Sequence, residues 1–282
     1  MVSLSEILQV EHLKKYFVKK NFFGKESDTV RAVDDVSFSV QEGQTLVLAG
    51  ESGSGKSTIA KLILHAILPD SGKVIFDGTE ITSKKEDLRK IRMGVQMVYQ
   101  DPYDSINPQM KIRDIISEPL EIHKIADSKK RTELVREVLH EVKLEPADDI
   151  MEKYPHMLSG GQRQRVVLAR ALVLKPKMIV ADEPVSMLDV SIRAEVLELM
   201  EGLRKKYNIS FLYITHDLAT ARYFGQRIAI LYKGKIVEIG PIDEVLFSPK
   251  HPYTHALLDA LSELDPNNLT REKKIRVTDF SK

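Results

Sequence analysis

The chain has 282 residues, 43% of them hydrophobic, and 42 basic side chains against 41 acidic ones, which suits one large α/β domain with a subdomain or tail. The balanced charge gives no reason to expect a nucleic-acid partner, and the absence of cysteine excludes disulfides, thiolate metal sites and iron–sulfur clusters. No apolar run approaches the roughly 20 residues that cross a bilayer and the first residues lack a signal-peptide pattern, so we expect a soluble, cytoplasmic protein that reaches a membrane only through a partner.

The first third of the chain is predicted to form strands separated by turns. Its short runs are either alternating or continuously apolar, which are the patterns of half-buried and fully buried strands. One helix is expected there, and Pro69 with the turn residues after it ends that helix. The predicted elements are strands at 36–40, 45–49, 73–76 and 94–99 and a helix at 57–68.

The middle of the chain differs from the first third in its charge content and in the spacing of its apolar residues. Residues 111–143 are charge-rich with helical spacing, which predicts a helical insertion rather than more sheet. After Lys175-Pro176 strands and helices alternate again, and this alternation predicts a mostly parallel sheet with helices on both faces. The remaining predicted elements are helices at 159–174 and 191–206, strands at 177–181 and 209–215, and two strands within 227–240 that join at Lys233-Gly234.

Residues 50–57, GESGSGKS, fit the phosphate-binding loop pattern, in which two glycines bracket four residues before Lys-Ser. Glycines let backbone amides approach phosphate oxygens, and the helix that follows points its free N–H groups at the anion. Lys56 would neutralise phosphate charge, and the Ser57 hydroxyl is a hard oxygen ligand for Mg²⁺. A flexible Gly/Ser turn is the alternative, but an apolar strand leads in and a helix leads out. The predicted nucleotide-binding residues of this segment are Glu51, Ser52, Gly53, Ser54, Gly55, Lys56, Ser57 and Thr58.

Two carboxylates, Asp182 and Glu183, follow the apolar strand predicted at 177–181. Parallel sheets place their ligands at the carboxyl ends of their strands. Asp182 is expected to hold Mg²⁺ through a water molecule, and Glu183 to orient or deprotonate the attacking water. Taken alone, Asp-Glu-Pro is an ordinary loop, and only the preceding phosphate loop favours the catalytic interpretation.

A second phosphate-binding device is predicted at Leu158-Ser159-Gly160-Gly161-Gln162. Ser159 is a natural N-cap for the helix that follows, and a helix N-terminus attracts anions. Two glycines in a first turn cost about 1 kcal/mol each relative to alanine, which makes sense if a ligand approaches the backbone there. One nucleotide needs only one phosphate loop, so this device would serve a nucleotide on another chain; the alternative is a capped helix with a glycine-rich lead-in.

These three motifs, which follow one another along the chain as 50–57, 158–162 and 182–183, resemble those of the ATP-binding subunits of ABC transporters in kind and in order, and the resemblance covers about residues 7–260. In that family LSGGQ is the signature motif, which binds the γ-phosphate held by the facing subunit, so that two subunits enclose two ATP molecules. The resemblance implies an α/β P-loop NTPase fold with a mixed sheet, an N-terminal β-subdomain, a helical subdomain and a short C-terminal extension.

The resemblance also implies roles for isolated residues. Gln100 is similar to the Q-loop glutamine that contacts Mg²⁺ and water, and His216 to the switch histidine at the γ-phosphate. Ser186 and Asp189 belong to a segment that resembles the D-loop, which touches the opposite subunit. Without the other motifs, Gln100 and His216 would be polar residues at strand ends and Asp189 a helix cap. The implied catalytic set is Lys56, Glu183 and His216, and the implied metal ligands are Ser57, Gln100 and Asp182.

The adenine-stacking aromatic of the family is matched by Phe17 or, alternatively, by Tyr16. Either ring could instead belong to the core. Met187 stands where the D-loop usually has alanine, and we expect it to alter packing between subunits rather than to abolish activity.

Two further segments resemble the oligopeptide and dipeptide importers of this family: QDPYDSINP at 100–108 and SPKHPYTHALL at 248–258. Ile106 and Gln109 depart slightly from the usual residues. The implied division is an ATPase domain over 1–245, with its helical subdomain at about 101–174, and an oligopeptide-transporter-type extension over 246–282.

The expected function is ATP hydrolysis that powers import of oligopeptides or dipeptides from the cytoplasmic face of the membrane, with ATP and Mg²⁺ as cofactors. Expected partners are a second ATPase subunit, a paralogue rather than a second copy, two transmembrane permease subunits and an extracytoplasmic substrate-binding protein.

Import of oligosaccharides or nickel chelates is the first alternative. A soluble ATPase outside transport is the second, disfavoured because such proteins carry coiled-coil insertions or two cassettes. A non-catalytic nucleotide-binding regulator is disfavoured because Glu183 and His216 are both present, and an exporter because no membrane helices are fused to the chain.

Overall fold

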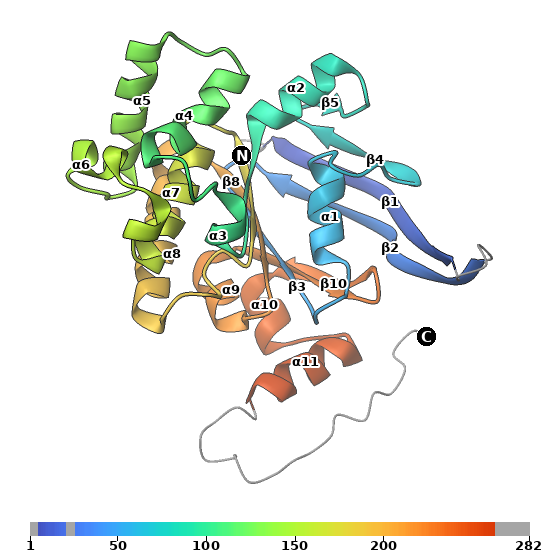
Figure 1. Cartoon of the computed structure of the whole chain (residues 1–282). Helices are drawn as coiled ribbons and strands as arrows, with labels where there is room; N and C mark the ends of the chain where they lie inside the picture. Colours follow the sequence, from blue (N-terminus) through green and yellow to red (C-terminus); the bar gives the residue numbers. More distant parts are fainter. Residues whose placement is uncertain (1–4, 21–25, 263–282) are drawn as a thin grey trace.

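The computed structural model describes residues 5–20 and 26–262, which form two sheets with helices around them (Figure 1). The strands are β1 (Glu6–Lys20), β2 (Glu26–Gln41), β3 (Thr45–Ala49), β4 (Ser71–Phe76), β5 (Thr79–Glu80), β6 (Val95–Val98), β7 (Met178–Asp182), β8 (Ser210–Thr215), β9 (Arg227–Tyr232) and β10 (Lys235–Pro241). The helices are α1 (Lys56–Ile63), α2 (Lys85–Gly94), α3 (Pro102–Ser105), α4 (Ile112–Ile122), α5 (Ser128–Glu141), α6 (Ala147–Glu152), the 3-10 turn η1 (Pro155–Met157), α7 (Gly160–Leu172), α8 (Val190–Tyr207), α9 (Leu218–Phe224), α10 (Ile242–Phe247) and α11 (Pro252–Ser262).

The larger sheet has the strand order β10-β9-β3-β8-β7-β6. Its strands run parallel except for β10, which returns antiparallel to β9. The strands β3 and β8 are buried at every position, because their continuous apolar runs are covered on both faces. The turn between β9 and β10 falls at Lys233 and Gly234, as the sequence predicted, and both residues have positive φ. The expectation of a mixed sheet is confirmed.

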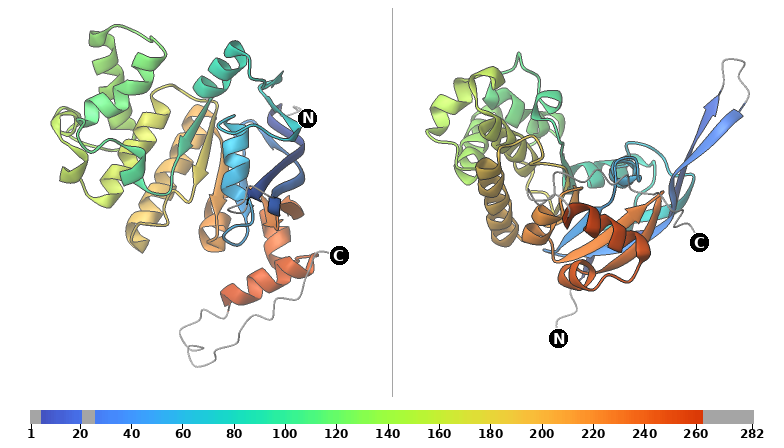
Figure 2. Two further views of the ribbon diagram at one scale, coloured as in Figure 1. Left: turned by 45° about the vertical axis from the view of Figure 1, so that its right-hand side comes forward. Right: turned by 90° about the horizontal axis from the view of Figure 1, so that it is seen from below.

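The smaller sheet, β2-β1-β4-β5, is antiparallel, and its β1–β2 hairpin projects from the body of the molecule (Figure 2). Helix α1 packs between the two sheets. Its Ile59 and Ile63 share one core with Leu13 and Val36 of the smaller sheet and Leu48 of the larger one. The phosphate loop that precedes α1 is therefore held between two sheets.

Helices α4 to α8 lie on the other side of the larger sheet and share a second apolar core with it (Figure 1). This core joins Ile115, Leu139 and Leu168 of the helices to Ile179 and Phe211 of β7 and β8. Within the described residues, no helix is both long and apolar enough to span a membrane.

Several elements differ from the sequence predictions or were not foreseen, among them α1, β1 and α11. The helix predicted over 57–68 ends at Ile63, because His65 takes a left-handed backbone conformation with φ 53°. Strand β1 was not predicted as a single strand, since register shifts break its alternation between Val10 and Lys15. Helix α11 begins inside the HPYT segment (residues 251–254), which was identified by its family resemblance without a predicted secondary structure.

Candidate functional site

The phosphate loop leaves the carboxyl end of β3 and turns into α1. Gly50, Gly53 and Gly55 all have positive φ, at 150°, 78° and 111°. A Cβ at Gly55 would lie 2.1 Å from the carbonyl oxygen of Ala32, and one at Gly50 would lie 2.2 Å from that of Leu231. Glycine is therefore required at both positions by conformation and by space.

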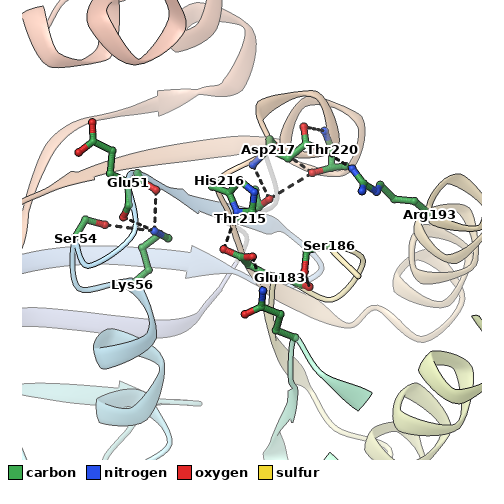
Figure 3. A network of polar contacts seen from close by, with 12 residues as sticks. Glu51, Ser54, Lys56, Glu183, Ser186, Arg193, Thr215, His216, Asp217 and Thr220 are labelled. Carbon is green, nitrogen blue, oxygen red and sulfur yellow. Dashed lines mark hydrogen bonds and ion pairs between the residues drawn. The ribbon is translucent and has the colours of Figure 1, made fainter. Parts of the chain in front are cut away.

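The Lys56 ammonium points back into this loop (Figure 3). It donates hydrogen bonds to the carbonyls of Gly50 and Glu51, each at 2.8 Å, and lies 3.5 Å from the Ser54 hydroxyl. Burial lowers the pKa of Lys56, while the carboxylates of Glu183 and Asp182 act in the opposite direction. The loop thus holds a cation whose charge is only partly balanced by the protein, which favours an anionic ligand.

Asp182 ends β7 beside Ser57. Burial raises the pKa of the Asp182 carboxyl, and a hydrogen bond with the Ser57 hydroxyl and the charge of Lys56 lower it. The phosphate loop and the acidic pair, which are far apart in the sequence, meet because β3 and β7 both flank β8 in the parallel sheet. A hydroxyl and a carboxylate at one point make a donor set that suits Mg²⁺.

Glu183 is the centre of a second cluster. Its backbone is left-handed, with φ 48°, and its N–H donates to the carbonyl of Ile214 at 2.8 Å. Its carboxylate accepts a hydrogen bond from Gln100 Nε2 at 3.1 Å and lies 2.8 Å from His216 Nδ1 (Figure 3). The Glu183 side chain is 17% exposed and that of His216 is 61% exposed. A partly buried carboxylate that two polar side chains hold in one orientation has the arrangement of a general base.

The structure therefore brings together six of the residues singled out in the sequence: Lys56, Ser57, Gln100, Asp182, Glu183 and His216. Gln100 follows β6 and His216 follows β8, so the strand order of the sheet sets their places. Ser186, the first D-loop residue, donates its hydroxyl to the carbonyl of Glu183 at 3.0 Å. The D-loop is thus tied to the same cluster.

The signature segment lies outside this cluster, at the start of α7. Ser159 is the N-cap, and its hydroxyl accepts the N–H of Gln162 while the Gln162 side chain accepts the N–H of Ser159. A Cβ at Gly161 would lie 2.5 Å from Ile192 Cγ2 of α8, and one at Gly160 would lie 3.6 Å from Leu188 Cδ2. Leu158 is buried, so the segment presents its glycines and polar residues at a capped helix end.

Phe17 and Tyr16 differ in how they are held. The Tyr16 hydroxyl donates to Asp34 at 2.6 Å, and its N–H donates to Asp70 at 2.6 Å. Phe17 is 43% exposed, with the Lys15 ammonium 5.7 Å from its ring centre. An exposed ring is the better candidate for stacking on a base, and the role of Phe17 stays a prediction.

Sequence reasoning missed one linking group, the ion pair between Arg193 and Asp217. Arg193 of α8 contacts the Asp217 carboxylate at 3.0 Å and donates to the carbonyl of Leu188 in the D-loop at 3.3 Å. Asp217 follows His216 and caps α9 by accepting the N–H of Ala219 at 2.9 Å. Asp217 had a sequence signal, because aspartate is a common helix N-cap and this one comes soon after the strand predicted at 209–215. Arg193 had no such signal. Both line a cavity of about 250 Å³ beside Glu183.

Replacing Arg193 with Met is expected to lower the ATPase activity that the sequence resemblance implies severalfold, because the predicted D-loop and the loop of His216 lose their shared support. The loss of thermal stability should correspond to about 1–3 kcal/mol, since Asp217 keeps its amide partners. Steady-state ATPase assays and thermal unfolding measure both effects. Arg222→Met, which removes the exposed pair with Asp243, is the matched control; equal activities in the two variants would contradict the prediction.

Two family models and several known proteins match this chain over most of its length. The model of the family "ABC transporter" matches residues 33–186, and that of the family "Oligopeptide/dipeptide transporter, C-terminal region" matches residues 237–282. The chain is 44% identical over 274 residues to the oligopeptide transport ATP-binding protein OppF of Bacillus subtilis, covering 95% of this chain and 87% of that protein. It is 46% identical over 262 residues to OppF of Streptococcus mutans, covering 91% of this chain and 84% of that protein.

Solved structures are similar over most of the chain. A dimeric ATP-binding cassette bound to ADP and phosphate, in a post-hydrolysis state, superposes with a TM-score of 0.71 at 27% identity, covering 83% of this chain and 98% of that one. The cbiO1 subunit of a Clostridium perfringens ABC transporter complex gives a TM-score of 0.73 at 23% identity, covering 94% and 97%, and supports the fold.

Proposed function

This chain belongs to the family of ABC transporter ATP-binding subunits, and we propose that it is the ATP-hydrolysing subunit of an importer for oligopeptides or dipeptides. The observation that carries the proposal is the Glu183 carboxylate, held between Gln100 and His216 beside the phosphate loop. The peptide assignment is supported by the match of residues 237–282 to the oligopeptide/dipeptide C-terminal family and by the peptide-transport relatives.

In the proposed reaction, backbone amides of the phosphate loop other than that of Glu51 bind the phosphates of ATP, together with the Lys56 ammonium. Glu183 takes a proton from the attacking water, Gln100 and His216 hold the carboxylate in place, and His216 faces the γ-phosphate. The Phe17 ring stacks on adenine.

Mg²⁺ is the metal that fits the residues present. The Ser57 hydroxyl and the Asp182 carboxylate meet at one point, and the amide oxygen of Gln100 would be the third oxygen ligand. When bound, the cation would neutralise phosphate charge. The burial that raises the pKa of Asp182 would then be offset by the positive charge beside it.

We further propose that two such subunits enclose ATP, with each phosphate loop facing residues 158–162 of the other, and that the second subunit is a related but different chain. Ser186 and Asp189 of the D-loop would contact that subunit, and the exposed Met187 and Val190 beside them supply apolar contact area. The domain bounds 1–245, 101–174 and 246–282 belong to the same proposal.

Membrane permease subunits are the partners that membership of a peptide importer implies. A groove of about 290 Å³ lies between β6 and the helices α4 and α7, and Tyr99, the neighbour of Gln100 in the sequence, lines it. Its exposed Tyr99 and Ile122 suit the apolar face of a short helix from a permease. Docking there would place the chain on the cytoplasmic face of the membrane, with an extracytoplasmic binding protein delivering the peptide.

The test is the ATPase activity of the purified chain as a function of its concentration, alone and with a candidate paralogue. Because the sandwich needs two subunits, activity per subunit should rise with concentration, or rise when the paralogue is added at constant concentration. A rate per subunit that stays the same in both series would reject the two-subunit mechanism. Absence of any magnesium-dependent ATPase activity in either series would reject the proposed function.

A further inference from the structure

Helix α11 is anchored to the larger sheet through Glu238 of β10. The Glu238 carboxylate accepts the N–H of Lys250 at 2.8 Å and that of His251 at 3.1 Å, at the start of the HPYT segment. Burial raises the pKa of Glu238, but the groups that hydrogen-bond its carboxylate, these two amides among them, outweigh burial, and its pKa lies below the ordinary value. The C-terminal helix is therefore held in one place on the domain (Figure 2).

This anchoring places Tyr253 against the phosphate loop. Tyr253 is 2% exposed, and its ring lies 4.1 Å from that of Tyr232, centre to centre. Its hydroxyl accepts the N–H of Glu51 at 3.3 Å, across 202 residues of sequence. Burial raises the pKa of Tyr253 to about 12, so the phenol stays neutral and protonated at ordinary pH.

The loop at Glu51 is consequently held on two sides. The carbonyls of Gly50 and Glu51 face the Lys56 ammonium, while the N–H of Glu51 faces Tyr253. The residues 51–54 and the first turns of α11 also line a shared cavity of about 190 Å³. The extension and the loop thus face each other around the Tyr253 contact.

We propose that Tyr253 is a positioning residue of the phosphate loop, and that α11 thereby sets how tightly this subunit holds ATP. The inference rests on the ATPase function proposed above. A loop already ordered before the nucleotide arrives loses less conformational freedom on binding, which raises affinity. Tyr253 touches none of Gln100, Glu183 and His216 in the contacts described, so its effect should fall on binding rather than on the chemical step.

The experiment compares Tyr253→Phe with wild type in the full chain. The substitution removes only the hydroxyl and leaves the N–H of Glu51 without this acceptor. The KM for ATP should rise about three- to tenfold, the range expected for one hydrogen bond, while kcat stays within about twofold. The Kd for ADP, measured by calorimetry, should rise by a similar factor, because ADP uses the same loop without hydrolysis.

Tyr223→Phe is the matched control, because Tyr223 is an exposed tyrosine, 59% accessible, on α9. Unchanged KM and ADP Kd in Tyr253→Phe, or an equal rise in Tyr223→Phe, would overturn the inference. If Tyr253→Phe does not fold, Glu238→Gln takes its place, since it weakens the anchor of α11 without touching the loop. A raised KM in Glu238→Gln supports the inference, and a wild-type KM overturns it.

Different results would reject the proposed ATPase function and the proposed role of α11. If wild type does not hydrolyse ATP under any partner condition, the proposed function is wrong. If wild type hydrolyses ATP and the Tyr253→Phe chain binds both nucleotides as wild type does, only the role of α11 is wrong.

Discussion

Replacing Glu183 with Gln is expected to lower the rate of ATP hydrolysis by about 10²–10⁴-fold while leaving ATP binding intact. Glutamine matches glutamate in size and can keep hydrogen bonds with Gln100 and His216, but it cannot accept a proton from water. Phosphate release measures the rate, and calorimetry with ATP measures binding. Because hydrolysis reopens the proposed sandwich, size-exclusion chromatography in ATP and Mg²⁺ should show a trapped dimer.

The control for this variant is Glu152→Gln. Glu152 is a glutamate of α6 with a half-exposed side chain, paired with Lys111 and Arg113 and placed in the helical layer. Its substitution should leave the rate near that of wild type. A near-normal rate in Glu183→Gln itself would show that another group activates the water.

Replacing Lys56 with Met is expected to weaken ATP binding by about ten- to a hundredfold, the loss of a charge-assisted contact to phosphate. Met is unbranched and of similar length, so it fills the space of the lysine stem. The carbonyls of Gly50 and Glu51 would lose their common donor, and the loop would also be less ordered. Calorimetric titration with ATP gives the affinity directly.

The fold should tolerate Lys56→Met better than ATP binding does. Burial lowers the pKa of Lys56, which means that the folded protein disfavours this charge relative to water. The variant should therefore unfold within a few degrees of wild type. Lys73→Met, at an exposed pair with Glu11, is the control; wild-type affinity for ATP in Lys56→Met would exclude the proposed phosphate contact.

Local sequence patterns predicted much of this fold because they report local physics. Continuous apolar runs predicted β3 and β8, since a strand covered on both faces has no polar positions to alternate with. Ser159 was predicted as an N-cap because a cap is formed within one helical turn, and the structure adds the reciprocal bond with Gln162. The β1 strand was not resolved as one element, because its bulges destroy the period-two signal.

The sequence by itself determined the family, the phosphate loop and the residue types of the site, because glycine conformation, helix capping and carboxylate chemistry are properties of short segments. Only the tertiary structure decided that Gln100 and His216 flank Glu183, that Arg193 joins the D-loop to Asp217, and that Tyr253 meets the N–H of Glu51. These contacts depend on the order of strands in the sheet and on where a distant helix packs. Hydrogen bonds between residues that far apart carry no periodic signal along the chain, so the folded arrangement alone specifies them.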